Sequence, residues 1–421
     1  MLNAAFDHTG VVLHLTIALI LILAVARLGG LVARWLGQPT VVGEIAAGML
    51  IVPVMLASTG TARERLLPTN VVEGLRFCGE VGLALYLVGI AHEIRLDRLG
   101  PNAGGWITAG SLILPLLSGA ALAGWIVWTD NEALRGTAPT AAFTVMLAVS
   151  LAITAVPVLS RILASRKMIT TPVGQLAMAA ALSIDVVAWL LLAAAIALAA
   201  GGVGGILGTA TVLVAGTLAA IGLARLLFTG TARRLASRYP RGAAIGLGTT
   251  AVAAGILTEH HGVTIVFGAT LVGLAVCGKG SDNPWTAAVH KSAALGHLLV
   301  PAFFVVSGAW MIPADWSTLP WVALAVAVAL AIAGKAGGSY LGARLAGQDH
   351  WTGLRLAALM NTRGLTEIVV LQAGLAAGLI TSGLFFALVM MALVTTVITG
   401  PALSAIERFA PPRHTAWSAR N

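Results

Sequence analysis

Charge is the first thing that this chain lacks. Only 10% of its 421 residues are Asp, Glu, Lys or Arg, against about 25% in an average soluble domain. The formal net charge is +9, and a positive excess can indicate binding to nucleic acid. Here, however, the basic residues are distributed between long apolar segments and form no single patch. The composition therefore excludes an ordinary soluble domain, and the placement of the charges argues against a nucleic-acid partner.

Cysteine is nearly absent as well. Cys78 and Cys277 are the only two, so the chain has neither a disulfide framework nor cysteines with metal-ligand spacing. No nucleophile–base pair or phosphate-binding loop stands at credible spacing, and we therefore expect neither an enzyme nor a cofactor. The N-terminus also lacks any basic residue before Arg27. Because a cleaved signal peptide begins with a charged segment, we expect the first apolar segment to remain.

Apolar residues make up 58% of the chain, and they form runs long enough to cross a bilayer. A hydrocarbon core about 30 Å thick requires about 20 apolar residues per helix. The sequence therefore predicts an all-α polytopic membrane protein, with one domain over residues 1–409 and a short cytoplasmic tail over 410–421. About 13 transmembrane helices are expected, at residues 10–30, 39–57, 75–93, 104–127, 138–160, 171–200, 204–228, 242–258, 262–278, 297–313, 319–343, 353–379 and 382–405.

The basic residues also predict the orientation of the chain, because Lys and Arg accumulate in cytoplasmic loops. With the N-terminus outside, 17 of them fall in inward-facing segments and only 3 in outward-facing ones, namely Arg63, Arg65 and Arg135. We therefore expect a multi-pass protein with its N-terminus outside and its C-terminus in the cytoplasm.

Two of the predicted spans contain residues that interrupt a helix. Pro157 lies in span 138–160, where it cannot donate a backbone hydrogen bond and clashes with the preceding turn. Asn361 and Gly364, both poor helix formers, lie in span 353–379. These are the fifth and the twelfth of the 13 predicted spans. Spans that are seven positions apart cross the membrane in opposite directions, so the first six and the last six spans can form an inverted repeat. Broken helices at matching positions of such a repeat indicate an ion site near the midplane of the membrane.

Asp185 is the single charged residue between Lys167 and Arg225. An Asp at the centre of a membrane helix costs about 2.5–3.5 kcal/mol on insertion scales, so its presence indicates a function. Because removal from water disfavours the bare anion, we expect Asp185 to bind a proton and a metal cation, Na⁺ or K⁺, in turn. The alternative is a carboxylate that is merely neutralised by a buried positive charge. The two interpretations are compatible, because such a pair can break when the cation binds.

Six segments of the chain are characteristic: PTVVGEIAAGML (39–50), LYLVGIAHEI (85–94), ITAVPVLSRIL (153–163), ALSIDVVAWLLL (181–192), VPAFFVVSGAW (300–310) and MNTRGLTEIVVL (360–371). Together they resemble the monovalent cation:proton antiporters. The resemblance is to the second such family, the bacterial sodium/proton and potassium/proton exchangers, which are related to plant endomembrane cation/proton exchangers. It extends over nearly the whole chain.

The resemblance implies the sodium/proton antiporter fold, in which two broken helices cross, usually as a homodimer in the bacterial inner (plasma) membrane. It implies that an ion-carrying bundle, about residues 104–200 and 319–405, moves against a scaffold, about residues 10–95 and 204–313, that holds the dimer contact. The implied function is secondary active antiport of Na⁺ or K⁺ against H⁺ by alternating access, with the cation, the proton and the lipid bilayer as partners.

Carried over by position, the resemblance makes Asp185 the ion-binding aspartate and Thr154 the threonine at the crossover. Lys335 matches a lysine of span 11, and Glu44 matches an acid of span 2. Arg363 and Glu367 match a charged pair of span 12. Lys335 either partners the aspartate or neutralises helix ends at the crossover. Arg363 and Glu367, four residues apart, can pair and either hold the bundle or lie on the ion path. Glu44 either funnels ions or anchors the structure.

The chain departs from the family pattern beside the aspartate. The family usually has Asp or Asn where this chain has Ile184, and that residue often pairs with the lysine of span 11. With one central carboxylate we predict electroneutral one-for-one exchange, and Lys335 either reaches Asp185 itself or loses its proton. Thr154 either supplies a coordinating oxygen or caps its own broken helix. Ser183 is a further candidate, because it can supply polarity lost at Ile184.

Three other functions stay open at this point. A passive cation channel requires a continuous polar pore, for which the spans are too apolar. A non-transporting cation sensor or immunity protein would bind cations without counterflow of protons. An exporter of an organic cation or ionophore would use the same fold for a larger substrate.

Overall fold

The computed structural model describes most of the chain, and all regular structure within the described ranges is helical: residues 2–48, 69–93, 101–200, 204–277, 283–309 and 320–410. Ten helical segments, one of which (Thr140–Ser165) contains a short break, are long and apolar enough to cross a membrane. The remaining predicted spans coincide with helical residues 40–48, with α13 (Ile265–Ala275), and with α16 (His350–Met360) plus α17 (Leu365–Ala376). The polytopic all-α membrane fold is therefore confirmed, while residues 49–57 of the second predicted span lie outside the described residues.

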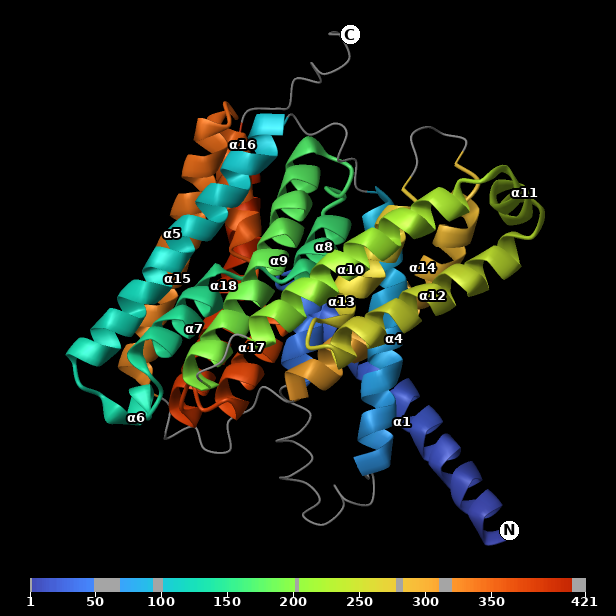
Figure 1. The fold of residues 1–421 in the computed structure, drawn as a ribbon, viewed down its shortest axis with the longest axis horizontal. Helices are drawn as coiled ribbons and strands as arrows, with labels where there is room; N and C mark the ends of the chain where they lie inside the picture. The colour runs from blue at the N-terminus through green and yellow to red at the C-terminus, as the bar shows by residue number, and fades with distance from the viewer. Residues whose placement is uncertain are drawn as a thin grey trace.

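The helices form two groups, which occupy the left and right sides of Figure 1. Besides α16 and α17, the first group contains α5 (Pro101–Trp128), α6 (Glu132–Arg135), α7 (Thr140–Ala152), α8 (Val156–Ser165), α9 (Pro172–Ala200), α15 (Trp321–Leu345) and α18 (Ser382–Phe409). Besides α13, the second contains α1 (Leu2–Trp35), α4 (Thr69–Glu93), α10 (Gly204–Leu227), α11 (Gly230–Arg238), α12 (Pro240–His260) and α14 (Thr286–Ala309). Helix α9 packs against α10, and this contact joins the two groups.

Matching helices of the two halves of the chain pack in pairs, α5 against α15 and α4 against α14. In the first pair Gly110 and Gly338 face each other, and a Cβ on either one would collide with the backbone carbonyl of the other. Small residues of this kind let two membrane helices approach closely. The neighbouring hydroxyls are buried in the same contact, where Ser111 Oγ donates to Ser339 Oγ at 2.9 Å. The close approach brings side chains of α15 within hydrogen-bonding distance of backbone groups of α5.

Helix α16 begins at a side-chain cap. Asp349 Oδ1 accepts hydrogen bonds from the backbone N–H groups of Trp351 and Thr352, at 2.9 and 3.1 Å. Burial raises the pKa of Asp349, but hydrogen bonds from Thr352 and Trp351 outweigh it and hold that pKa below its ordinary value. Such a cap satisfies N–H groups that have no partner within the helix, and so it fixes the start of the first half of the broken span.

Three helix boundaries differ from the prediction, and each difference involves basic residues. Helix α8 continues to Ser165, past the predicted end at residue 160, and so includes Arg161. Helix α14 begins at Thr286, before the predicted start at residue 297, and includes Lys291. Helix α11 lies between two predicted spans. These helices exceed the predicted bounds because a helix can extend past its apolar stretch once its ends reach polar surroundings.

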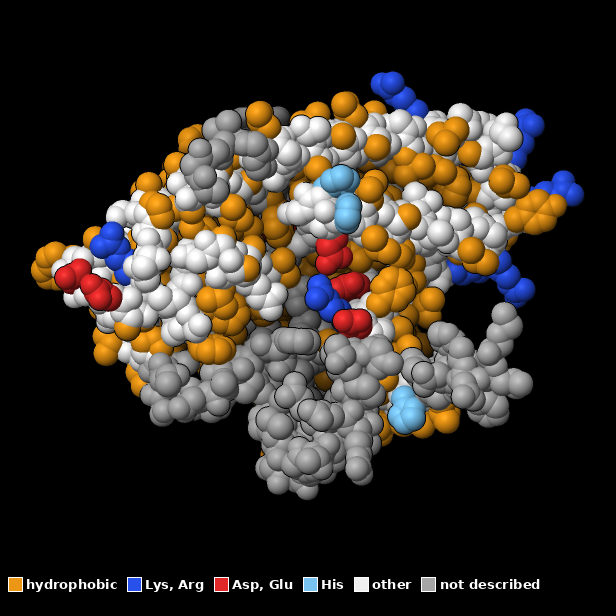
Figure 2. Space-filling view, turned by 60° about the horizontal axis from the view of Figure 1, so that its bottom comes forward, with side chains coloured by type: hydrophobic (Ala, Val, Ile, Leu, Met, Phe, Trp, Pro, Cys, Tyr) orange, Lys and Arg blue, Asp and Glu red, His pale blue; other side chains and the backbone are white. Residues whose placement is uncertain are grey.

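The surface of the single chain is largely apolar. In Figure 2, hydrophobic side chains cover much of the described surface, and acidic, basic and histidine side chains gather near its centre. Helices α4 and α12 contribute a linked set of charges, in which Arg76 Nε lies 2.7 Å from Glu80 Oε1 and Arg76 Nη2 lies 3.5 Å from Glu259 Oε1. Exposed apolar area of this extent is typical of a surface that contacts lipid.

Candidate functional site

The two broken spans cross and are joined by hydrogen bonds. The first break separates α7 from α8 at residues 153–155, and the second separates α16 from α17 at residues 361–364. The backbone N–H of Ala155 donates to the carbonyl of Thr362 at 3.2 Å. Thr154 Oγ1 donates to the carbonyl of Met360, also at 3.2 Å. The extended backbone of each break therefore satisfies polar groups of the other, as buried irregular backbone requires.

Local sequence explains where each span breaks. Pro157 lies in the first turn of α8, where its missing N–H does no harm, and it prevents α7 from continuing. Gly364 has φ +157° and ψ −130°, a backbone region that is essentially restricted to glycine. A Cβ at this position would also lie 2.7 Å from Val158 Cγ2 of the other broken span. Gly364 is therefore required both by its own backbone and by the close crossing.

Two buried cations cap the C-terminus of α7. The last carbonyls of a helix have no partner within it and carry a partial negative charge. Arg363 Nη1 donates to Ser150 O at 2.7 Å and Nη2 donates to Leu151 O at 2.5 Å. Lys335 Nζ donates to Ala152 O, the last carbonyl of α7. Arg363 and Lys335 are both fully buried, so hydrogen bonds to these carbonyls stabilise their charges in place of water.

Arg363 also pairs with Glu367, as expected, because Arg363 Nη1 lies 3.2 Å from Glu367 Oε1. The geometry differs from the expectation in one respect. Arg363 lies in the break itself, and only Glu367 belongs to a helix, the first turn of α17. Glu367 Oε2 is buried and has no hydrogen-bond partner among the described residues. The pair is therefore one corner of a network that fastens the second break to the end of α7.

Lys335 does not pair with Asp185. Besides Ala152, its ammonium donates to the carbonyl of Ser111 on α5 at 2.9 Å, and the described ion pairs include none between Lys335 and Asp185. Of the two interpretations of Lys335, its contacts match the one in which it neutralises helix ends at the crossover.

Asp185 lies on α9, which packs against all four half-helices, α7, α8, α16 and α17. Asp185 is 7% exposed, and its Oδ1 has no hydrogen-bond partner among the described residues. A buried carboxylate oxygen without a donor is unfavourable unless something binds it. Ile184 beside it is fully buried, whereas Ser183 is exposed and its hydroxyl donates to Ala179 O of its own helix at 2.9 Å.

Other buried oxygens around the crossover also lack donors. Asn361 Oδ1, Thr366 Oγ1 and Glu367 Oε2 have no hydrogen-bond partner among the described residues, and all three belong to the second broken span. The described residues contain no group of three or more His, Cys, Asp or Glu side chains that could together hold a metal ion. Any cation at Asp185 would therefore be bound by one carboxylate together with hydroxyl, amide and backbone oxygens, which are the ligands that hard cations prefer.

Glu44 has a partner that sequence reasoning missed. Arg161 Nη2 of α8 lies 2.7 Å from Glu44 Oε1 in helical residues 40–48, and Glu44 is buried. In the sequence analysis Arg161 counts only as one of the charges of the inward-facing segments. Its position four residues after Pro157, within the first turns of a new helix, is the signal that could have placed it in the membrane region.

The support of the second break by α18 was also missed. Thr396 Oγ1 accepts from the backbone N–H of Arg363 at 2.9 Å and donates to its carbonyl at 2.8 Å. Asn361 Nδ2 donates to Thr395 O at 3.4 Å. Thr396 within the apolar run 382–405 was the available sequence signal. Its hydroxyl and the backbone carbonyl of Thr395 hold the break in place.

Replacing Gly364 by Ala should lower the melting temperature of the purified protein by several degrees. The new Cβ meets Val158 and forces a residue with a side chain into a glycine conformation, which costs about 1–3 kcal/mol. Gly222→Ala in α10 is the matched control, since its Cβ would meet nothing within 4 Å. Equal melting temperatures for the two variants, measured by intrinsic fluorescence, would contradict the tight crossing.

Comparison with known proteins places this geometry in context. The family model described as the transmembrane region of sodium/hydrogen exchangers matches residues 20–408. Over 96% of its length the chain is 30% identical to the Na⁺/H⁺ antiporter NhaS4 of Synechocystis, all of which it covers. Over 94% of its length it is 33% identical to cation/H⁺ antiporter 20 of Arabidopsis thaliana, of which it covers 48%. The chain thus spans about half the length of this plant relative.

A solved structure shows the same fold. The chain superimposes on the sodium proton antiporter MjNhaP1 of Methanocaldococcus jannaschii with a TM-score of 0.66, over 94% of this chain and 98% of the other, at 15% sequence identity. A likeness at this identity concerns the arrangement of the helices. It matches the inverted repeat and crossing breaks expected from the sequence.

Proposed function

Because the chain belongs to the sodium/hydrogen exchanger family, a family of transporters and not of enzymes, we propose that it exchanges Na⁺ or K⁺ for H⁺ across a membrane. The observation that carries the proposal is the buried Asp185 oxygen without a donor, on the helix that packs against both broken spans. One titratable carboxylate at such a position is sufficient to bind a proton and a cation in turn.

In the proposed cycle, a proton and a dehydrated cation compete for the Asp185 carboxylate. Thr154 is a candidate ligand, because its hydroxyl donates to Met360 O and keeps its oxygen lone pairs available. The unpartnered oxygens of Asn361 and Thr366 are further candidates. An occupied Asp185 is neutral and crosses between the two sides, whereas the bare anion crosses poorly. Because only an occupied Asp185 crosses, the cation flux is coupled to the proton flux, and neither ion leaks across alone.

The charge arrangement supports a scheme with one carboxylate. Lys335 and Arg363 donate to the terminal carbonyls of α7, and Glu367 is paired with Arg363. These three charges are thus engaged with structure, and Asp185 is left as the exchangeable group. Ile184 supplies no second acid beside it. We therefore propose electroneutral exchange of one cation for one proton.

Alternating access requires one part of the molecule to move against another. The first group of helices, which carries Asp185 and both breaks, is proposed as the moving bundle, and the second group as the scaffold. We also propose a homodimer with its contact on the scaffold, an outside N-terminus and a cytoplasmic C-terminus, as the distribution of basic residues indicates. Ser183 is retained as a candidate only for the path of the ion, given its exposure.

Purified protein in proteoliposomes should move protons when a cation gradient is imposed, and it should build no membrane potential. The expected result is a pH change in an internal dye with Na⁺ or K⁺, and no signal with choline. Because one charge replaces one charge, a potential-sensitive dye should stay unchanged, and clamping the potential should not alter the rate.

Comparing Li⁺, Na⁺, K⁺ and Rb⁺ in the same assay gives the selectivity. A cation-dependent membrane potential would overturn the one-for-one scheme while leaving antiport intact. Saturable cation binding with no proton movement would overturn the antiport proposal itself and indicate a sensor.

A further inference from the structure

Helix α11 carries a dense group of arginines that form no ion pair with an acid among the described residues. Arg233, Arg234 and Arg238 lie within its nine residues and are all exposed. The sequence has no Asp or Glu between residues 186 and 258, and the described ion pairs include none of the three. Together these guanidinium groups form a concentrated positive charge at the end of the apolar helices α10 and α12.

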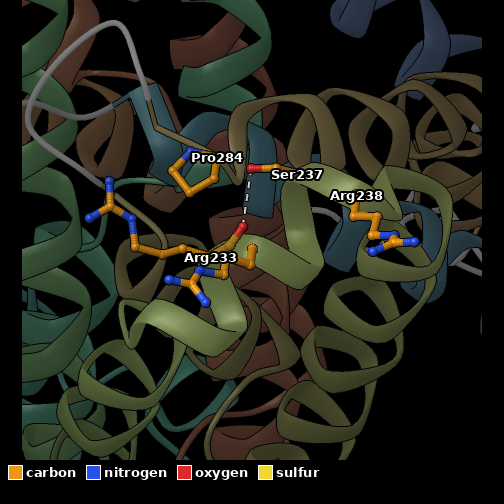
Figure 3. A pocket seen from close by; sticks show the side chains of 5 residues that line it. Arg233, Ser237, Arg238 and Pro284 are labelled. Atoms are coloured by element: carbon orange, nitrogen blue, oxygen red, sulfur yellow. Dashed lines mark hydrogen bonds between the residues drawn. The ribbon is translucent and has the colours of Figure 1, made fainter.

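The arginines border a hollow at the surface. It is lined by the three arginines together with Ser237 and Pro284. Figure 3 shows Pro284 and Ser237 on one side of α11, and the Arg233 and Arg238 side chains extending in different directions. The Ser237 hydroxyl donates to the Arg233 carbonyl at 3.1 Å. A guanidinium group binds phosphate through charge-assisted hydrogen bonds, and three such groups line the hollow.

An apolar cavity of about 440 Å³ lies next to the hollow at Arg238, because the guanidinium carbon of Arg238, which lines the hollow, lies 5.7 Å from the ring centre of Tyr239, which lines the cavity. Its walls come from α10, α11 and α12, including Leu223, Leu235 and Leu247. Leu235 is 59% exposed, so the cavity opens at the surface of the chain. Trp285 forms another wall and is fixed there, because its Nε1 donates to Leu227 O at 3.0 Å.

Glycines on α12 keep this cavity open. Gly242 and Gly246 line it, and a Cβ at Gly246 would meet no atom within 4 Å. The cavity therefore has room for a flexible apolar chain along α12. It is separate from the crossover of the broken helices, since its walls come from α10, α11, α12 and Trp285.

We propose that this double site binds an anionic phospholipid, with its phosphate on the α11 arginines and an acyl chain in the adjoining apolar cavity. Each half of the site matches one half of such a lipid. A basic amphipathic helix at the end of membrane spans lies at the headgroup level, where anionic lipids concentrate. A free phosphate would use the arginines alone and leave the cavity without a role, so the lipid accounts for both features.

The test measures binding of defined lipids to the full chain purified in a neutral detergent, by native mass spectrometry at increasing lipid concentration. The probes are phosphatidylglycerol, phosphatidylcholine with the same acyl chains, and inorganic phosphate. Phosphatidylglycerol should bind at stoichiometric amounts and at least about tenfold more tightly than phosphatidylcholine, because each nearby basic residue favours an anionic lipid. Inorganic phosphate should neither bind tightly nor displace the lipid.

Two variants separate the halves of the site. Combined Arg233→Gln, Arg234→Gln and Arg238→Gln should weaken phosphatidylglycerol binding at least about tenfold. Gly246→Leu should weaken it as well, while leaving every charge in place, because its side chain fills the cavity. The second variant keeps the proposal testable if the first fails to fold, and melting temperatures report on folding for both.

The matched control removes three positive charges elsewhere, through Arg34→Gln, Lys291→Gln and Arg408→Gln. All three residues are exposed, and this variant should bind phosphatidylglycerol like the wild type. Three outcomes would overturn the proposal: equal loss in the control, unchanged binding in Gly246→Leu, or binding of inorganic phosphate as tight as that of the lipid. None of these measurements depends on transport, so the site and the antiport proposal can fail independently.

Discussion

Replacing Asp185 by Asn should abolish cation-driven proton movement, with rates reduced by at least about a hundredfold. The amide has nearly the same shape as the carboxylate but takes up no proton in the accessible pH range and carries no charge for a cation. Since no other unpaired acid is seen beside it in the described part of the chain, no second group takes over. The measurement is the pH-gradient assay in proteoliposomes, with each cation that the wild type transports.

The loss in Asp185→Asn should occur without loss of fold. A buried carboxylate that lacks donors destabilises a protein, so the neutral variant should melt at the same temperature as the wild type or above it. Asp130→Asn is the matched control, since it makes the same chemical change at an exposed residue with φ +48°, a conformation that Asn tolerates. Exchange at wild-type rate by Asp185→Asn would contradict the central role of this carboxylate.

Replacing Arg363 by Met should cause the largest loss of stability, about 3–5 kcal/mol, the range for breaking a buried ion pair by removing one partner. The change leaves Glu367 buried without its cation and removes the donors to Ser150 O and Leu151 O. The expected result is little or no monodisperse protein on size-exclusion chromatography and a strongly lowered melting temperature.

A double variant distinguishes the two parts of this effect. Arg363→Met with Glu367→Gln removes the unpaired charge but still leaves the α7 carbonyls without donors, so it should recover only part of the lost stability. Glu367→Gln alone should be milder than Arg363→Met, because Arg363 keeps both carbonyl acceptors. A wild-type melting temperature for Arg363→Met would contradict the capping of α7, and full recovery in the double variant would assign the whole effect to the charge pair.

The sequence predicted the features that depend on composition along the chain. Apolar length located the spans, Pro157 and Gly364 located the two breaks, and the isolation of Asp185 in a long uncharged stretch identified a candidate site. Each of these signals is local, because the cost of placing a charge or a break in a membrane is felt at that position.

Partners across long sequence separations could not be predicted in the same way. Thr154 was expected either to coordinate an ion or to cap its own broken helix. Its hydroxyl donates instead to Met360 O, at the end of the first half of the other broken span, so it does not cap its own helix, and ion coordination stays a prediction. The ammonium of Lys335 has carbonyl acceptors on α5 and α7, which depend on how closely α5 and α15 approach. Such contacts follow from helix packing, and hydropathy carries no information about it.

The Glu44–Arg161 pair, finally, connects residues 40–48 to α8, the second half of the first broken span. If α8 travels with the carrier while residues 40–48 stay with the stationary part, this bond is a latch that must open and close once in every turnover. Separating a buried pair of opposite charges costs free energy unless water or another charge replaces the lost partner. The latch would then govern how fast the transporter cycles, independently of how tightly it holds its ion.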